Sequence, residues 1–147
     1  MKIYMDLCCL NRPFDDQSQA RVALESHAVI LILEKIDRGE HTLCNSAALI
    51  VENRLSPRFH VRLEIDVLLE RAGIYVAHDK TIDARVAELR KMGFKEFDAY
   101  HIAAAETAGC DCLVTCDDKL LSVARRNAAI IGVRVTDPVG LVSEEGF

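Results

Sequence analysis

Short apolar segments alternate with helical segments along the whole chain, and this alternation restricts the fold more than any other feature. The expected strands are short, rich in Val, Ile, Leu, Tyr and Cys, and bounded by turn-forming residues; they are 2–5, 41–45, 74–77, 112–115 and 131–135. The expected helices are 19–39, 46–55, 58–73, 81–93, 95–109 and 117–128. Nearly continuous apolar strands separated by helices indicate a parallel sheet covered on both faces. The sequence therefore predicts an α/β fold, a three-layer α/β/α sandwich around a central five-stranded parallel sheet.

The organisation of the chain predicts a single domain over residues 1–147, because there is no linker, repeat or low-complexity segment. Residues 143–147 are expected to be a frayed tail. The start of the chain has no apolar leader, and no apolar run is long enough to cross a bilayer, so a cytoplasmic protein without membrane association is expected. The six cysteines lack the spacing of a zinc site, and in a reducing compartment they are interpreted as small apolar residues.

The charge and aromatic content restrict how the chain could meet nucleic acid. A net charge of −5 argues against a surface that grips nucleic acid everywhere. Aromatic residues make up only 5% of the chain, too few for an extended base-stacking platform. A local basic patch, or a catalytic centre whose acids are neutralised by metal ions, remains compatible with these numbers.

Carboxylates follow the expected strands at one edge of the predicted sheet. Asp6 ends the strand 2–5, and Asp117 and Asp118 follow the strand 112–115. Glu52 and Asp98 lie early in helices that begin near that same edge, and helical side chains lean towards the N-terminus of their helix. Ligand sites of open parallel sheets lie at this edge. Four separate segments are therefore expected to bring a carboxylate to one cleft.

Each acid also has a purely structural explanation when it is taken alone. Asp118 is a good helix N-cap, Asp6 suits a turn, and Asp98 complements the positive end of its helix. Several carboxylates in one pocket, however, repel each other unless a cation neutralises them. Oxygen ligands suit Mg²⁺ or Mn²⁺, and such ions promote hydrolysis at phosphorus by activating a water. These residues therefore predict a metal-dependent phosphodiesterase.

Four segments in the same order resemble the PIN domain: "IYMD", "SAALIVE", "FDAYHIAAA" and "LVTCDD". The resemblance covers essentially the whole chain and implies a PIN-like α/β/α fold with Mg²⁺- or Mn²⁺-dependent ribonuclease activity on RNA. Many small members are VapC-like toxins that have an antitoxin partner and form homodimers, so both partners are implied here. The resemblance assigns the acidic tetrad and metal ligands to Asp6, Glu52, Asp98 and Asp117. It also implies that Thr115 holds a metal-bound water or the Asp117 carboxylate.

The sequence departs from the family pattern after the first acid. Cys8 stands where the family often has Asn, and Asn11 is the nearby candidate to replace it. Asp118 is a fifth candidate ligand. Arg12 and Lys119 are candidates for contacting RNA phosphates, although a solvated or salt-bridged role suits each equally well.

Two alternatives remain open from the sequence. His101, one helical turn after Asp98, could face the cleft, but a packed, hydrogen-bonded core histidine is the preferred interpretation. The chain could also be a catalytically silent PIN-like module that only binds a protein partner. The retained acids argue against that second alternative, because buried carboxylates without a cation would destabilise the fold.

Overall fold

A computed structural model describes all residues, 1–147, and contains one five-stranded parallel sheet. Its strand order is β3-β2-β1-β4-β5. The strands are β1 (Lys2–Met5), β2 (Thr42–Ser46), β3 (Ile74–Val76), β4 (Cys112–Val114) and β5 (Arg134–Thr136). The first strand therefore lies at the centre of the sheet, with β2 and β3 on one side and β4 and β5 on the other.

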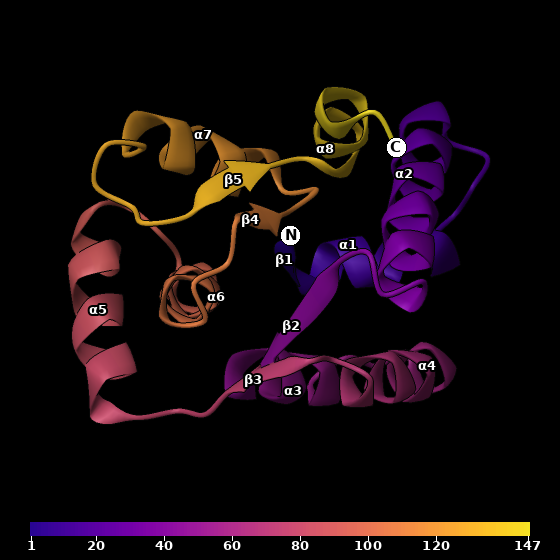
Figure 1. The fold of residues 1–147 in the computed structure, drawn as a ribbon. Coiled ribbons are helices and arrows are strands. Elements are labelled where there is room, and N and C mark those ends of the chain that lie inside the picture. The colour runs from indigo at the N-terminus through magenta and orange to yellow at the C-terminus, as the bar shows by residue number, and fades with distance from the viewer.

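Helices cover both faces of this sheet, and the predicted three-layer α/β/α sandwich is confirmed (Figure 1). The helices are α1 (Leu7–Asn11), α2 (Ala20–Asp37), α3 (Ala47–Arg54), α4 (Phe59–Glu70), α5 (Lys80–Lys91), α6 (Glu96–Thr107), α7 (Asp118–Arg126) and α8 (Pro138–Glu145). In Figure 1, α2 and α8 pack together on one side of the sheet, and α5 and α6 lie together on the other. No helix combines the length and the apolar character that crossing a membrane requires.

The central strand explains why the apolar segments are nearly continuous. Ile3, Tyr4 and Met5 are all 0% exposed, because β1 has a hydrogen-bonded strand on each side and a helical layer on each face. Leu49 of α3 and Ile102 of α6 are likewise fully buried in the same core. Burial of a side chain of this size stabilises the fold by about 1.5–3 kcal/mol.

Two helices and the C-terminal tail differ from the sequence-based expectations. Helix α1 has only five residues, too few for a periodic pattern to show. Helix α8 begins at Pro138, with Asp137 accepting a hydrogen bond from the Gly140 N–H, and it includes residues 143–145. The helix therefore continues into the segment for which a frayed tail was expected. The tail is held because its last residue, Phe147, stacks on His41 with ring centroids 5.1 Å apart.

Arg85 of α5 connects three parts of the second helical layer, and its loss is expected to destabilise the protein. Its guanidinium makes two hydrogen bonds to Glu106 of α6, at 2.8 and 3.0 Å, and one to the Ile130 carbonyl at 3.1 Å. We expect Arg85→Met to lower the free energy of unfolding by about 1–3 kcal/mol, because Glu106 would lose its charged partner. The measurement is urea denaturation.

Arg90→Met on the same helix is the matched control for this substitution. Arg90 is half-exposed, and its ion pair with Glu96 is long, at 3.8 Å. We expect a change within about 0.5 kcal/mol, as for most surface substitutions. Equal effects of the two substitutions would contradict the role assigned to Arg85.

Candidate active site

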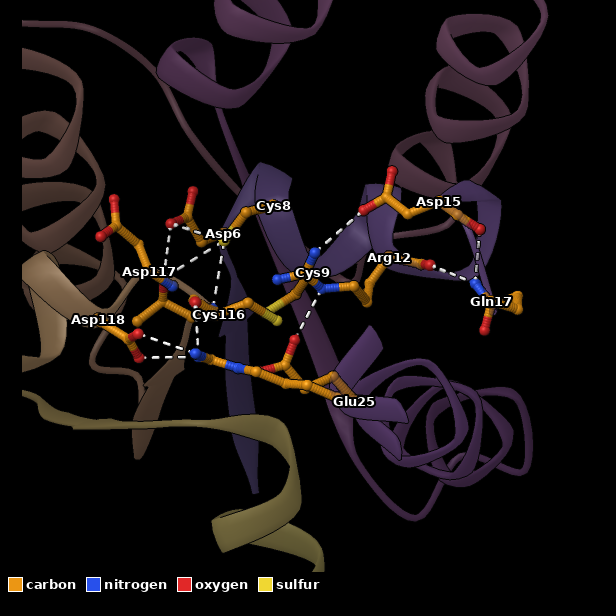
Figure 2. Close-up of polar contacts among 12 residues, drawn as sticks. Asp6, Cys8, Cys9, Arg12, Asp15, Gln17, Glu25, Cys116, Asp117 and Asp118 are labelled. Atoms are coloured by element: carbon orange, nitrogen blue, oxygen red, sulfur yellow. Dashed lines mark hydrogen bonds and ion pairs between the residues drawn. The ribbon is translucent and has the colours of Figure 1, made fainter. Parts of the chain in front are cut away.

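The site lies where the strand order switches, at the carboxyl ends of β1 and β4. These two strands are adjacent and parallel, with Met5 paired to Val114. Asp6 follows β1 directly, and Asp117 comes three residues after the end of β4. Figure 2 shows both carboxylates on the same side of the strand ends. This is the place where open parallel sheets bind their ligands.

Asp6 is a buried carboxyl group in a poorly solvated position. It is only 5% exposed, and its Oδ2 accepts hydrogen bonds from the Thr115 hydroxyl at 2.8 Å and the Cys8 thiol at 3.3 Å. Burial raises the pKa of Asp6 to about 8, and the nearby Cys8 and Glu52 add to this rise. A carboxyl group with this pKa is largely protonated at neutral pH unless a cation takes the place of the proton.

The structure places Thr115 on a different carboxylate from the one that the resemblance implied. The hydroxyl donates to Asp6, and it accepts a hydrogen bond from the backbone N–H of Asp117 at 3.1 Å. It does not contact the Asp117 carboxylate. The reason is that Thr115 follows β4 directly, so its side chain points at the neighbouring strand β1 and at the residue that follows it. Thr115 thus ties the two acid-bearing segments together.

Glu52 reaches the site through His101. The Nε2 of His101 lies 3.4 Å from a Glu52 oxygen and 3.7 Å from an Asp6 oxygen. Its Nδ1 is hydrogen-bonded to the Tyr4 hydroxyl at 2.7 Å, and that hydroxyl also contacts the Ser46 hydroxyl at 2.6 Å. His101 is therefore buried and hydrogen-bonded, as the preferred interpretation expected, and it also touches two of the candidate acids.

The charge state of His101 depends on these acids. Burial disfavours the imidazolium form, but the Glu52 hydrogen bond and the charges of Asp6 and Asp98 outweigh burial, and the pKa of His101 is raised. A buried imidazolium between two carboxylates offsets part of their negative charge. Sequence alone did not show the Tyr4 and Ser46 contacts that hold this ring, because the three side chains come from β1, β2 and α6.

Asp98 lies in the first turn of α6 and completes the acidic group electrostatically. Its pKa is raised to about 6 by burial first, and then by the charges of Asp6, Asp117 and Glu52. The charge of each of the other three acids thus acts on Asp98.

The two aspartates that follow β4 have different roles from those that the sequence predicted. Asp117, and not Asp118, is the N-cap of α7: its Oδ1 accepts from the N–H groups of Lys119 and Leu120, at 2.8 and 3.3 Å. Its Oδ2 accepts no hydrogen bond and is free to bind an ion. Both oxygens of Asp118 are engaged by Arg21 of α2, at 2.7 and 2.8 Å, so that we leave Asp118 out of the ligand set.

The other candidate residues lie around the acidic group in different ways. Arg12 is salt-bridged, which was one of the two roles expected for it: it pairs with Glu25 at 2.8 Å and with Asp15 at 3.2 Å. Asn11 ends α1, its buried Oδ1 lacks a hydrogen-bond partner, and none of its hydrogen bonds reaches an acid. Lys119 lines a groove of about 400 Å³ next to Asp98, together with two other basic side chains. Of these three residues, Lys119 is the one that lines this groove.

Tyr4→Phe is expected to destabilise the protein. The substitution removes the hydroxyl that binds Ser46 and His101 and leaves the His101 Nδ1 buried without a partner. We expect the free energy of unfolding to fall by about 1–3 kcal/mol, which urea denaturation measures. Tyr75→Phe, on an exposed tyrosine of β3, is the control and should change stability by less than about 0.5 kcal/mol. An unchanged free energy of unfolding in Tyr4→Phe would mean that the hydrogen bonds from Tyr4 to Ser46 and His101 do not stabilise the structure around the site.

Comparison with known proteins identifies the family and the fold of this chain. The family model of the PIN domain matches residues 22–126. A solved structure, VapBC2 from Rickettsia felis bound to a DNA fragment from their promoter, matches with a TM-score of 0.61 and 13% sequence identity, over 93% of this chain and 98% of that chain. At this sequence identity, the similarity between the two proteins shows a shared fold alone. No curated protein matches the sequence. With a family match over most of its length and the fold described above, this chain belongs to the PIN-domain family.

Proposed function

We propose that the protein is a Mg²⁺- or Mn²⁺-dependent endoribonuclease that hydrolyses RNA phosphodiester bonds. The observation that carries the proposal is the close group of Asp6, Glu52 and His101 at the switch point of the sheet, whose ligand atoms lie within 4.8 Å of one another. The charges of Asp6, Glu52 and Asp117 also act on Asp98, which supports a shared acidic site. Asp6, Asp98 and Asp117 are the proposed metal ligands, and Glu52 completes the set or orients the attacking water. Nuclease chemistry is what the PIN-domain family generally performs, which supports the same proposal.

The residues fit a hard divalent cation. Every proposed donor is a carboxylate oxygen, the type of ligand that Mg²⁺ and Mn²⁺ prefer. The raised pKa values of Asp6, about 8, and Asp98, about 6, reflect burial and mutual repulsion that a bound cation relieves. When bound, the ion supplies a water of lowered pKa for attack on phosphorus and stabilises the developing charge.

The residues of the chain contribute orientation and proton handling. Thr115 holds the Asp6 carboxylate through its 2.8 Å hydrogen bond, and the cap of α7 holds Asp117 with one oxygen free. The Nε2 atom of His101 lies between the carboxylates of Glu52 and Asp6. A proton on this nitrogen orients Glu52 and stands between the two acids. A group that has already been oriented does not need to be ordered during the reaction.

The groove beside Asp98 is the proposed path of the RNA backbone. It runs between the start of α6 and α7, and its basic lining consists of Lys95, Lys119 and Arg126. Phosphate contacts of this kind position a nucleic acid without reading its sequence. Arg12 is not assigned to the substrate here, because Glu25 and Asp15 already pair with it.

A protein partner of the antitoxin type is the second part of the proposal. A structural neighbour is the VapBC2 complex. In this chain α3, its C-cap and α4 bear exposed apolar side chains: Val51, Leu55, Phe59, Leu63 and Val67. Exposed apolar rows of this kind mark protein interfaces. A homodimer stays a prediction, for which light scattering of the purified chain is the measurement.

The test is cleavage of a mixed RNA pool by the purified protein with Mn²⁺, with Mg²⁺ and with EDTA, beside a single-stranded DNA pool. The proposal expects RNA fragments in the metal arms and none with EDTA. Cleavage that persists in EDTA would contradict the metal dependence. Absence of cleavage in every arm, combined with capture of a protein partner, would favour the silent partner-binding module.

A further inference from the structure

Three cysteine thiols meet next to the acidic site, from segments that lie more than a hundred residues apart in the chain. The Sγ atoms of Cys8, Cys9 and Cys116 all lie within 4.8 Å of one another. The Cys9 and Cys116 sulfurs are 3.4 Å apart, and the Cys116 N–H donates to the Cys8 sulfur at 3.2 Å. Cys9 and Cys116 are buried, whereas Cys8 is half-buried. The cluster is therefore a compact group of three sulfurs with one side accessible to solvent.

The three sulfurs lie close enough together to share one metal ion. A metal–sulfur bond of about 2.3 Å places two thiolate ligands about 4 Å apart, which lies within the span of this cluster. Three sulfurs converge, whereas a disulfide uses only two. Thiolate ligands favour soft ions such as Cu(I) and Zn²⁺ over Mg²⁺ or Mn²⁺. The cluster and the neighbouring oxygen site thus differ in the ions that they select.

Two arginines, both already paired with carboxylates, lie near Cys116; Figure 2 labels one of them, Arg12. Arg12 approaches Cys116 from α1's end, and Arg21 lies 3.5 Å from the Cys116 carbonyl. Both arginines are themselves fixed by Glu25, at 2.8 Å each. The charge of these arginines is thus taken up by carboxylates, and a cation bound by the sulfurs would itself have to compensate a buried set of thiolates, because an uncompensated buried charge destabilises the fold.

We propose that Cys8, Cys9 and Cys116 form a binding site for one thiophilic cation, separate from the carboxylate site. Cu(I) is the better match because three sulfurs complete its coordination. Zn²⁺ is nearly always four-coordinate and would need a water on the open side of Cys8. The proposal does not depend on nuclease activity, since none of its ligands is one of the four acids.

The position of this site gives a bound ion a structural effect. Cys8 and Cys9 follow Asp6 closely, and Cys116 directly precedes Asp117. The Cys8 sulfur also lies 3.3 Å from both the Asp6 carboxylate and the Thr115 hydroxyl. An ion held by these sulfurs would therefore fix the segments after β1 and β4 relative to each other, and it should raise the thermal unfolding midpoint.

The experiment is an anaerobic titration of the reduced protein with Cu(I), in competition with a chromophoric chelator, and in parallel with Zn²⁺. We expect one tightly bound equivalent of at least one of these ions, and at least a tenfold weaker affinity in Cys9→Ser and in Cys116→Ser. Cys110→Ser is the matched control, because it removes a buried thiol from the separate Cys44–Cys110 contact at 3.1 Å.

Several results would overturn the proposal. One is the absence of a tight equivalent for both ions; another is an affinity that is lost in Cys110→Ser but kept in Cys9→Ser. X-ray absorption of the loaded wild-type protein gives a readout that does not require the variants to fold. A first coordination shell with three sulfurs supports the site, and a shell of oxygen and nitrogen alone contradicts it.

Discussion

Asp6→Asn is expected to lower RNA cleavage by more than about 100-fold. Loss of a residue that only supports a metal ligand typically costs 10–100-fold in affinity or activity, and loss of a ligand should cost more. The comparison of initial cleavage rates for wild type and variant at saturating Mn²⁺ measures the effect. Asp111→Asn is the matched control: it makes the same change at the opposite end of the sheet, where Asp111 accepts a hydrogen bond from the Lys2 N–H at 2.7 Å.

The same substitution should make the metal-free protein more stable at pH 8. The Asp6 carboxyl is buried, and its pKa is about 8, so that the folded protein holds it partly in a costly ionised form at this pH. Asparagine has the shape of the protonated acid and can still accept from Thr115. Variants that destroy a site by unfolding the protein lower the melting temperature, whereas this one should raise it. Activity equal to wild type, or a lowered melting temperature with lost activity, would contradict this account of Asp6.

The free energy of unfolding of the metal-free protein is expected to fall as the pH rises from about 4 to about 8. The pKa of Asp6 is 3.8 ordinarily and about 8 in the folded protein, so over this range the folded state holds a proton that the unfolded state has released. Stability falls with pH wherever the folded state binds more protons. The expected loss is on the order of a few kcal/mol, because one pKa unit corresponds to about 1.4 kcal/mol.

Asp98 and His101 act in the same direction as Asp6. The pKa of Asp98 is raised to about 6 and that of His101 is raised above its ordinary 6.5, so both groups hold protons longer in the folded state. Urea denaturation in EDTA at a series of pH values measures the slope of the free energy of unfolding against pH. Added Mn²⁺ should flatten it, since an ion bound only to the folded state stabilises that state by mass action. A stability that rises with pH in EDTA would contradict the raised pKa of Asp6.

The fold could be predicted from the sequence because its strands carry an unusually simple signal. Residues 2–5 and 112–115 are nearly continuous in apolar character, since β1 and β4 are buried on both faces. Such strands are typical of parallel sheets covered by helices on both faces, which favours this layer arrangement. Helix α8 carries no comparable signal, and its place depends on contacts with distant elements such as α2.

The candidate site was only partly predictable. Asp6 and Asp117 follow strands, and the rule for parallel sheets brings them to one edge. The roles within the aspartate pair were not predictable, because either residue suits a cap and Arg21, which engages Asp118, lies almost a hundred residues away. The thiol cluster was missed for the same reason: Cys116 is adjacent to Cys8 only through the pairing of β1 with β4.

The most direct test of the central claim is to locate Mn²⁺ in crystals of the protein by anomalous diffraction. The account predicts a peak bounded by the carboxylates of Asp6, Asp98 and Asp117, close to Glu52, and its absence in Asp6→Asn crystals. A peak held elsewhere, for example by Asp118, with none among these carboxylates at millimolar Mn²⁺, would contradict the claim that this acidic group is a metal centre.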